Sequence, residues 1–342
     1  MPKIQILDMV DKVTSSLKAS ELLTNGKYPV YGAQGVSGYL NTYQTTKESI
    51  AIIKDGAGVG RVQIIPAYSS VIGTMQLLVP KSGFDVNYLY FLFDSLKLGE
   101  SYSGATIPHI YFKDYSKIFI NANDEKRQRE ISLRLSHINR LIETSNLEIE
   151  FLNELTKSRF NEMFGDPINN NLNLPLVTLS DISKLKSGKA IKTGELVDCN
   201  DGTLFPCYGG NGIRGYINRF SHEGFYPIIG RQGALAGNVS FANGKFYATE
   251  HAVVVHPKTT LNVTWYYYSL KMLNLMRFQS GAAQPGLSVE KLNDVKIPFP
   301  NLDSQNEFAI FVDQIDKLKF NVQKRIEKFK ELLNKKMDEY FN

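Results

Sequence analysis

Cysteine is scarce in this chain, and the usual export and membrane signals are missing with it. The two cysteines, Cys199 and Cys207, form no CxxC pair, which excludes a zinc ribbon and a dithiol redox motif. So few cysteines suit a reducing compartment. The N-terminal residues lack the basic and then apolar pattern of a secretory signal, and no apolar run approaches the ~20 residues that span a bilayer. The sequence therefore predicts a soluble, cytoplasmic protein with no membrane partner.

The motifs of several enzyme classes are missing as well. No Walker motif, nucleophile elbow or aminomethyltransferase signature occurs. The glycine run at residues 56–60 resembles a phosphate loop, but a strand-like segment follows it where a helix would have to meet the anion. Glu250, His251 and His256 come from one strand-like stretch, with no further ligand at a spacing that suits a metal. We therefore expect no catalysis, no metal and no cofactor in this chain.

Charge and composition permit a nucleic-acid partner without requiring one. The 342 residues include 39 Lys and Arg against 34 Asp and Glu, a formal net charge of +5. This excess is mild, and an ordinary soluble protein could carry it. Hydrophobic residues make up 43% and charged residues 21% of the chain, which is typical of globular domains. The length is sufficient for two domains with cores of their own.

A domain-sized repeat organises the sequence. Residues 28–39 (YPVYGAQGVSGY) align with residues 205–216 (FPCYGGNGIRGY) at an offset of 177 positions. The same offset, without a gap, relates Gly56 to Gly233, Gly60 to Gly237, Tyr88 to Trp265, Ser103-Gly104-Ala105 to Ser280-Gly281-Ala282, Pro108 to Pro285, Gln128 to Gln305, Glu130 to Glu307 and Phe164 to Phe341. Solenoid repeats have periods of about 20–50 residues. A period of this length indicates duplication of a whole domain.

The first part of each copy reads as short β-rich segments interrupted by glycine. Strands are expected at residues 50–53 and 62–65 in the first copy, and at 226–229 and 239–241 in the second. A short aromatic helix is expected near residues 87–95 and 263–272, with its rings in the core. Loops at residues 98–108 and 274–285 then lead to a helical part.

A long amphipathic helix ends each copy. Apolar residues recur every three to five positions, which predicts one apolar stripe per helix, as in a coiled coil. The predicted stripes are Ile131, Leu135, Ile138, Leu141, Ser145, Ile149, Leu152, Leu155 and Phe160, and Phe308, Val312, Ile315, Leu318, Val322, Ile326, Phe329, Leu332 and Met337. Neither helix can bury its stripe alone, so we expect the two to pair antiparallel.

The ends of the helices carry local signals. Asn123 or Asp124 is expected to cap the first helix, and Asp303 or Ser304 the second, because short polar side chains accept from the free N–H groups there. Gly165 is expected to end the first helix, with a proline two residues later.

These segments predict an α+β fold with an internal pseudo-two-fold repeat. Two tandem mixed α/β domains are expected at residues 1–121 and 178–301. The helices at residues 122–165 and 302–342 would form the antiparallel coiled coil, and residues 166–177, which contain three asparagines and Pro175, would be the linker.

Basic and aromatic residues are interspersed in both domains. Lysine and arginine bind phosphates, and polar side chains on loops contact base edges. The candidate DNA contacts are Lys54, Arg61, Tyr68, Lys189, Arg214, Arg231, Gln232 and Asn238. Two of them, Arg231 and Gln232, lie on a glycine-rich turn and suit the edges of guanine and adenine respectively. A lysine-rich surface and a solvated glycine turn without function are the alternatives.

The order of domains and helices and the sequence motifs resemble those of the specificity subunit of type I restriction-modification systems. The second copy carries the family-like runs FPCYGGNGIRGY (205–216), IGRQG (229–233), GNV (237–239) and AQPGL (283–287). Residues 163–167 and 297–305 resemble the family's helix boundaries. The first copy departs from the runs at Ala33-Gln34, Lys54-Asp55 and Thr106-Ile107-Pro108, which are loop positions expected to vary with the DNA target.

The resemblance implies two target recognition domains, each contacting one half of a bipartite double-stranded DNA target, spaced by the helices. Because the copies differ at their turns, we expect an asymmetric target. The family further implies two methyltransferase subunits docked on the helices, together with restriction subunits. These partners, rather than this chain, would use S-adenosylmethionine, ATP and Mg²⁺. The specificity subunit of a type IIB restriction enzyme is the alternative within the class, and a non-DNA coiled-coil scaffold or a stand-alone hydrolase the alternatives outside it.

Overall fold

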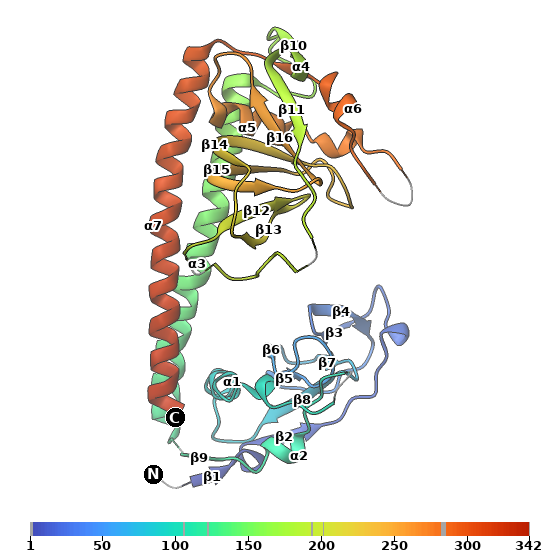
Figure 1. The fold of residues 1–342 in the computed structure, drawn as a ribbon. Coiled ribbons are helices and arrows are strands. Elements are labelled where there is room, and N and C mark those ends of the chain that lie inside the picture. The colour runs from blue at the N-terminus through green and yellow to red at the C-terminus, as the bar shows by residue number, and fades with distance from the viewer. Residues whose placement is uncertain are drawn as a thin grey trace. The chain divides into compact units, whose positions relative to one another are not determined.

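The protein divides into two compact units (Figure 1). Each unit contains one sheet-containing part, which we call its head, and parts of both long helices. The structure is a computed structural model that describes residues 3–104, 107–121, 123–192, 194–200, 202–281 and 285–341. Unit 1 comprises Met1–Leu147 and Gln323–Asn342, and unit 2 comprises Glu148–Val322. The domain boundaries drawn from the sequence stay predictions. Five residues of the predicted motifs lie outside the described residues: Ala105, Thr106, Ala282, Ala283 and Gln284.

Within the described residues, the head of unit 1 is built from three small sheets, two α-helices and three short 3-10 helices. Its elements are β1 (Lys3–Gln5), η1 (Ile6–Asp8), β2 (Val10–Val13), η2 (Ala19–Glu21), β3 (Tyr28–Gly32), β4 (Gly35–Leu40), β5 (Ser49–Ile53), β6 (Val62–Ile65), β7 (Ser70–Val71), β8 (Met75–Pro80), α1 (Val86–Ser95), η3 (Leu98–Glu100), α2 (Phe112–Tyr115) and β9 (Phe119–Asn121). The sheet orders are β2-β8-β5-β6, β4-β3-β7 and β1-β9. Strand β5 is buried along its whole length, because alternate side chains enter two different core clusters.

The head of unit 2 keeps this strand order, but its longer strands join the two larger sheets into one. Its elements are β10 (Leu176–Thr178), α4 (Leu179–Ile182), β11 (Ser183–Ser187), β12 (Phe205–Gly209), β13 (Gly212–Ile217), β14 (His222–Gly230), β15 (Val239–Ala248), β16 (Ala252–Pro257), α5 (Val263–Met272), η4 (Leu275–Phe278), α6 (Val289–Asn293) and β17 (Lys296–Pro298). One six-stranded sheet has the order β11-β16-β14-β15-β12-β13, and β10 pairs with β17. The strands and aromatic helices predicted from the sequence are all present.

The structure confirms the repeat from residue 28 onward and corrects it before that point. Strand β12 begins 177 positions after β3 (205 against 28), and α5 begins 177 positions after α1 (263 against 86). Strand β10, however, begins only 173 positions after β1 (176 against 3), although both make the same antiparallel pairing, with β17 and β9. The copies are therefore not gapless. The second copy has four extra residues before β12, in a loop, where insertions are tolerated.

The two long helices pair antiparallel within each unit. They are α3 (Glu125–Phe164) and α7 (Leu302–Phe341), each of 40 residues. In unit 1, Arg134 donates to the Tyr340 hydroxyl and Arg325 donates to Ser145, so numbering rises along one helix as it falls along the other. In unit 2, the rings of Phe160 and Phe308 meet edge-on with centroids 5.5 Å apart. Among the residues that the structure describes, none of the helices combines the length and apolarity needed to cross a bilayer.

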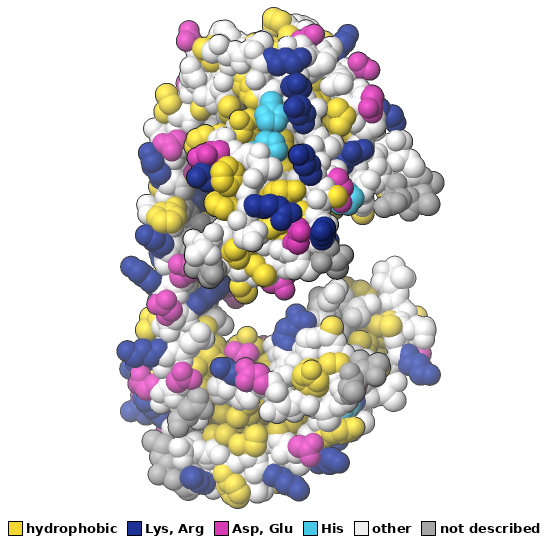
Figure 2. Space-filling view, viewed as in Figure 1, with side chains coloured by type: hydrophobic (Ala, Val, Ile, Leu, Met, Phe, Trp, Pro, Cys, Tyr) yellow, Lys and Arg dark blue, Asp and Glu magenta, His cyan; other side chains and the backbone are white. Residues whose placement is uncertain are grey.

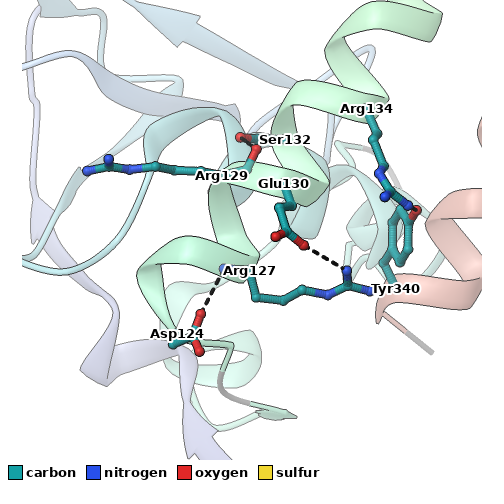
Figure 3. A network of polar contacts seen from close by, with 7 residues as sticks. All are labelled: Asp124, Arg127, Arg129, Glu130, Ser132, Arg134 and Tyr340. Carbon is teal, nitrogen blue, oxygen red and sulfur yellow. Dashed lines mark hydrogen bonds and ion pairs between the residues drawn. The ribbon is translucent and has the colours of Figure 1, made fainter.

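Polar contacts at the start of α3 reach Tyr340 of α7 in unit 1 (Figure 3). Asp124 caps α3 by accepting from the backbone N–H of Arg127 at 2.7 Å, as predicted. Arg127 pairs with Glu130 at 3.1 Å and lies over the Tyr340 ring of α7, 5.5 Å from its centroid. Arg134 reaches the same tyrosine, donating to its hydroxyl at 3.4 Å. Exposed pairs of this kind contribute little individually, so burial of the apolar stripes stabilises the pair.

The cap predicted for the second helix is wrong. Asn301 caps α7, because its Oδ1 accepts from the backbone N–H of Ser304 at 2.8 Å. The predicted caps, Asp303 and Ser304, instead lie inside the first turn of the helix. Helix α3 ends at Phe164 with Gly165 in the left-handed region at φ +70°, as predicted.

The predicted stripes are wrong at three positions, because Leu155, Leu318 and Leu332 are exposed. The inward row continues instead through Thr156, which is buried, and Lys319, which is half-buried. These two residues lie four positions after Leu152 and Ile315, whereas Leu155 and Leu318 lie only three positions after them. At 3.6 residues per turn, one of these two spacings must rotate a side chain out of a narrow seam.

Each head packs against the start of one long helix and the end of the other. In unit 1, the Tyr88 ring of α1 contacts Phe341 at the end of α7, with centroids 5.4 Å apart. In unit 2, the Trp265 ring of α5 contacts Phe164 at the end of α3, with centroids 6.3 Å apart. Tyr88 and Trp265 are fully buried, which confirms that the aromatic helices belong to the core.

A buried glutamine joins each head to its helix. Gln305 is 1% exposed, its Nε2 donates to the Pro300 carbonyl at 2.9 Å, and its Oε1 accepts from the backbone N–H of Asn262 at 2.8 Å. Gln128 accepts in the same way from the backbone N–H of Asp85 at 3.1 Å. The repeat of these glutamines therefore has a structural cause, since each satisfies buried backbone groups.

We expect Gln305→Leu to lower the free energy of unfolding of unit 2 by about 1–3 kcal/mol, because leucine leaves two buried backbone groups without a partner. Urea unfolding of the full chain, followed by fluorescence of its one tryptophan, Trp265, measures this. The control is Gln314→Leu, an exposed position on α7 in the same unit. An equal loss in the two variants would show that the buried bonds contribute nothing.

Candidate nucleic-acid interface

A hollow of about 650 Å³ opens on unit 2 between two turns of its sheet. One wall is the β12–β13 turn, residues 209–212, continued by Ile213 and Arg214. The other wall is the turn after β14, residues 232–235, and His251, the residue before β16, completes the lining. Both walls are glycine-rich, which brings the backbone close to whatever occupies the hollow.

Hydrogen bonds to neighbouring segments fix the turn after β14. The backbone N–H of Arg231 donates to the His251 carbonyl at 3.0 Å, and that of Gly233 donates to the Pro285 carbonyl at 3.0 Å. The N–H of Leu287 donates back to the Arg231 carbonyl at 2.9 Å. The run is a hairpin between β14 and β15, as expected, and a side chain on it is presented from a rigid support.

Three of the predicted contacts in the second copy gather at this hollow. Arg214 and Gln232 are exposed and line it from opposite walls. Asn238 is exposed beside them, and its Nδ2 donates to Oδ1 of Asn211, another lining residue, at 2.8 Å. A guanidinium and amides arranged over one concave surface offer the donors and acceptors that base edges require.

The other two predicted contacts of the second copy lie elsewhere. Arg231 is half-buried, and its Nη1 donates to Oγ of Ser187, at the end of β11, at 3.0 Å. Its Nε is buried without a hydrogen-bond partner among the described residues. Lys189 is exposed just after β11 and does not line the hollow. Arg231 thus joins the turn to a neighbouring strand, and its contact with guanine stays a prediction.

The equivalent turn of unit 1 carries different side chains on the same backbone frame. The N–H of Gly56 donates to the Pro108 carbonyl at 2.9 Å, as Gly233 does to Pro285 in unit 2. Where unit 2 exposes Gln232 opposite a glycine, unit 1 places the Asp55 carboxylate against Nδ1 of His109. His109 was not among the predicted residues, because nothing in the sequence shows which residue will face the turn.

The remaining predicted residues of unit 1 lie around this turn and at the far end of the sheet. Lys54 is half-buried, and the exposed Arg61 lies against Gly58. Tyr68 is 51% exposed at φ +57°, and its ring lies 5.3 Å from that of Tyr43. The structure therefore does not bring Tyr68 together with the turn residues.

An exposed aromatic cluster surrounds Tyr68 and has a counterpart in unit 2. The cluster in unit 1 is Tyr28, Tyr43 and Tyr68, and the equivalent residues of unit 2 are Phe205, Phe220 and Lys245. The Phe205 and Phe220 rings lie 5.2 Å apart, and the Lys245 ammonium lies 4.9 Å from the Phe220 ring centroid. Sequence reasoning missed Lys245, which the repeat offset would have aligned with Tyr68.

The residues considered for a metal do not converge. Oε1 of Glu250 and Nε2 of His251 lie 3.2 Å apart just before β16, whereas His256 lies near the far end of that strand. Within the described ranges, no group of three or more His, Cys, Asp or Glu side chains is placed to hold a metal ion.

Comparison with known proteins identifies the family. The profile of the family described as "Type I restriction modification DNA specificity domain" matches residues 4–154 and again residues 173–329. The chain belongs to this family. The match in both copies confirms the resemblance noted from the sequence, and it confirms two tandem domains of mixed helix and sheet with a long helix between them.

The family's curated members supply two useful relatives. The type I restriction enzyme EcoprrI specificity subunit of Escherichia coli is 43% identical over 142 residues, which cover 41% of this chain and 35% of that protein. The chain thus spans about a third of the length of that relative. The type I restriction enzyme MjaVIII specificity subunit of Methanocaldococcus jannaschii is 24% identical over 332 residues, covering 83% of this chain and 76% of that protein.

A solved structure shares the fold of the specificity domains over their full length. It is the type I restriction-modification system S subunit from M. genitalium, with a TM-score of 0.64 at 20% sequence identity. The match covers 100% of this chain and 96% of that one. The fold class predicted from the sequence is therefore confirmed, whereas the target and the partners are questions of function.

Proposed function

We propose that the chain is the DNA sequence-specificity subunit of a type I restriction-modification complex and recognises an asymmetric, bipartite target in double-stranded DNA. The observation that carries this proposal is the pair of equivalent turns. Both are held by the same backbone bonds, yet one presents Gln232 and the other the Asp55–His109 pair. Two domains that recognise different half-sites require the same backbone support and different side chains on it.

In unit 2, the hollow receives base edges of one half-site. Arg214 offers a bidentate guanidinium for guanine, and Gln232 offers an amide for adenine. Asn238 and Asn211, already bonded to each other, add donors and acceptors at the same rim. Lys189 of unit 2 and Arg61 of unit 1 contact the sugar–phosphate backbone of the DNA, because phosphates accept from lysine and arginine without regard to sequence.

The helix pair receives the partner subunits. In unit 1, a groove of about 410 Å³ is lined by Leu133, Ile138, Leu332 and Tyr340, with Arg134, His137 and Lys336 among its polar members. Leu133 is 71% exposed, and its repeat equivalent in unit 2, Ile310, is 64% exposed. Equivalent exposed apolar residues on both units suit two identical methyltransferase subunits, one for each unit.

The chemistry belongs to those partners. The methyltransferase subunits bind S-adenosylmethionine, and the restriction subunits that join them use ATP and Mg²⁺. This chain supplies recognition and positioning, with no catalytic step of its own. The support for this division is the family match and the turns, which offer base-reading groups.

Methylation mapping tests the proposal. The chain is expressed in a host with its methyltransferase partner, and modified adenines are mapped with and without it. We expect a bipartite adenine motif, different in its two halves, that is lost when the chain is omitted. Methylation that does not depend on the chain would refute the recognition role, and a palindromic motif would refute the asymmetry. A partner that fuses methyltransferase and nuclease would make the system type IIB.

A further inference from the structure

Basic side chains gather on one face of the six-stranded sheet of unit 2. They are Lys184 and Lys186 of β11, His222 of β14 and His256 of β16, and we call this set the basic–histidine face. Figure 2 shows histidine side chains beside a column of Lys and Arg side chains on the side of unit 2 turned toward the viewer. Both lysines are exposed, and both histidines are half-buried.

Strand register and alternation place these four residues together. Lys184 pairs directly with His256 across β11 and β16. The His256 ring lies 5.4 Å from that of His222 and 4.9 Å from that of Tyr226. Leu185 packs into the core that contains α5, so its neighbours Lys184 and Lys186 point to the opposite face.

Among the residues that the structure describes, no acid acts on the two histidines of the basic–histidine face. Burial lowers the pKa of His256, and His222, Lys186 and Lys184 lower it further. Burial and Lys186 likewise lower the pKa of His222. The neighbours from the adjoining strands are aromatic: Tyr226 of β14, and Phe246 of β15, whose ring stacks on His222 at 5.2 Å. Like charges without a counterion repel, and an anion would relieve that repulsion.

The atom Nε2 of His256 is a second, independent sign of a missing partner. It is buried and has no hydrogen-bond partner among the described residues. Buried polar atoms in native proteins are nearly always bonded, so this nitrogen keeps an unused capacity for one hydrogen bond. In contrast, Nδ1 of His222 already lies 2.8 Å from Oγ of Ser221.

The aligned positions of unit 1 that the structure describes do not form such a face. The strand pair β2–β8 corresponds to β11–β16, and its register places Asp11 opposite Val79 where unit 2 has Lys184 opposite His256. The residues aligned with Lys186 and His222 are Val13 and Thr45, which carry no charge. The cluster is therefore particular to unit 2 and is not required by the shared fold.

We propose that the basic–histidine face of unit 2 binds the sugar–phosphate backbone of DNA beside the half-site read by the hollow, and that unit 1 makes no equivalent contact. This inference rests on the proposed function. Strand β11 runs from Lys184 and Lys186 to Ser187, which is bonded to Arg231 at the base of the hollow's turn. The strand that carries both lysines thus ends at the turn that forms one wall of the hollow, so a polyanion lying along β11 reaches the hollow as well.

Salt dependence of DNA binding tests the lysines. The full chain is titrated with a fluorescent duplex of mixed sequence between about 50 and 200 mM salt, where each phosphate contact adds roughly 0.9 to the slope of log affinity against log salt. We expect the slope for Lys184→Gln/Lys186→Gln to be lower than that of the wild type by about 2, one step for each lysine. The control Lys328→Gln/Lys330→Gln removes the same charge from exposed sites on α7 and is expected to leave the slope unchanged.

The outcomes separate this inference from the proposed function. A steep wild-type slope that Lys184→Gln/Lys186→Gln leaves unchanged would refute the basic–histidine face and leave DNA recognition standing. An equal reduction of the slope in the α7 control would mean that the loss of any two lysines has the same effect, which would also refute a specific role for the basic–histidine face. A wild-type chain whose affinity for DNA does not change with salt would overturn both proposals.

The pH dependence of binding tests the histidines. A phosphate beside His256 and His222 favours their protonated forms and raises their pKa above the lowered pKa of the free chain, so binding takes up protons in the pH range between the two. The affinity of the wild type for the same duplex is therefore expected to fall as the pH is raised through that region. His222→Gln/His256→Gln is expected to remove this dependence. A wild type that binds equally at each pH, or a variant that keeps the full dependence, would contradict the part assigned to the histidines.

Discussion

Gly237→Ala is expected to destabilise unit 2 strongly, whereas Gly233→Ala, four residues earlier on the same turn, is expected to cost little. Both glycines are in the left-handed region, at φ +94° and +86°. Adding a side chain at either position therefore lowers the free energy of unfolding by about 1–2 kcal/mol. Only at Gly237 does the new Cβ meet backbone, 2.5 Å from the nitrogen of Met276. Nothing lies within 4 Å of a Cβ at Gly233.

The clash at Gly237 adds about 1–3 kcal/mol of overpacking to the conformational cost. We therefore expect a total loss of about 2–5 kcal/mol for Gly237→Ala, against about 1–2 kcal/mol for Gly233→Ala. Urea unfolding followed by Trp265 fluorescence reports both. Equal losses would mean that η4 moves away from the turn without cost. In unit 1, Gly60 and Gly56 form the same contrast, because a Cβ on Gly60 would meet the backbone of Gly99 and one on Gly56 would meet nothing.

The repeat was the most informative feature of the sequence for the fold. It predicted both hairpins, both aromatic helices and both long helices, because each of these has a strong local pattern that occurs twice. Applied further, it would also have identified Asn301 as a cap, since Asn301 aligns with Asp124. The missed gap before β12 has a simple cause: the N-terminal strands are short, and no glycine or aromatic motif marks their register.

The candidate site was predictable only in part. Neighbouring side chains on an extended chain point in opposite directions, and the sequence does not show which of two neighbours faces the hollow. Arg231 and Gln232 are adjacent in sequence and looked equally suited to base reading. In the structure, Gln232 faces the hollow while Arg231 turns to Ser187 on another strand. The pairing of β11 with β16 joins residues far apart in the chain, so neither the Ser187 contact nor the basic–histidine face could be read from the sequence.

Gln232→Ala is expected to relax recognition at one position in one half of the target and leave the other half unchanged. An amide bonded to adenine contributes about 1–3 kcal/mol of discrimination against the wrong base, equivalent to roughly five- to 150-fold in preference. Methylation mapping with the variant in place of the wild type reads this out as one degenerate base in the motif. Arg214→Ala, on the facing wall of the hollow, is expected to act on the same half.

Asp55→Ala provides the matched contrast, because it changes the equivalent turn of unit 1 and frees His109 from its carboxylate partner. It is expected to alter the other half of the motif only. Gln314→Ala, at an exposed site on α7, is expected to alter neither half. If Gln232→Ala and Asp55→Ala both degraded the same half, or if either lowered methylation evenly across all sites, the assignment of one turn to each half-site would be wrong. Two turns with one backbone frame and separable effects are the outcome that the duplicated fold predicts, since each unit can change its reading residues without disturbing the other's hydrogen bonds.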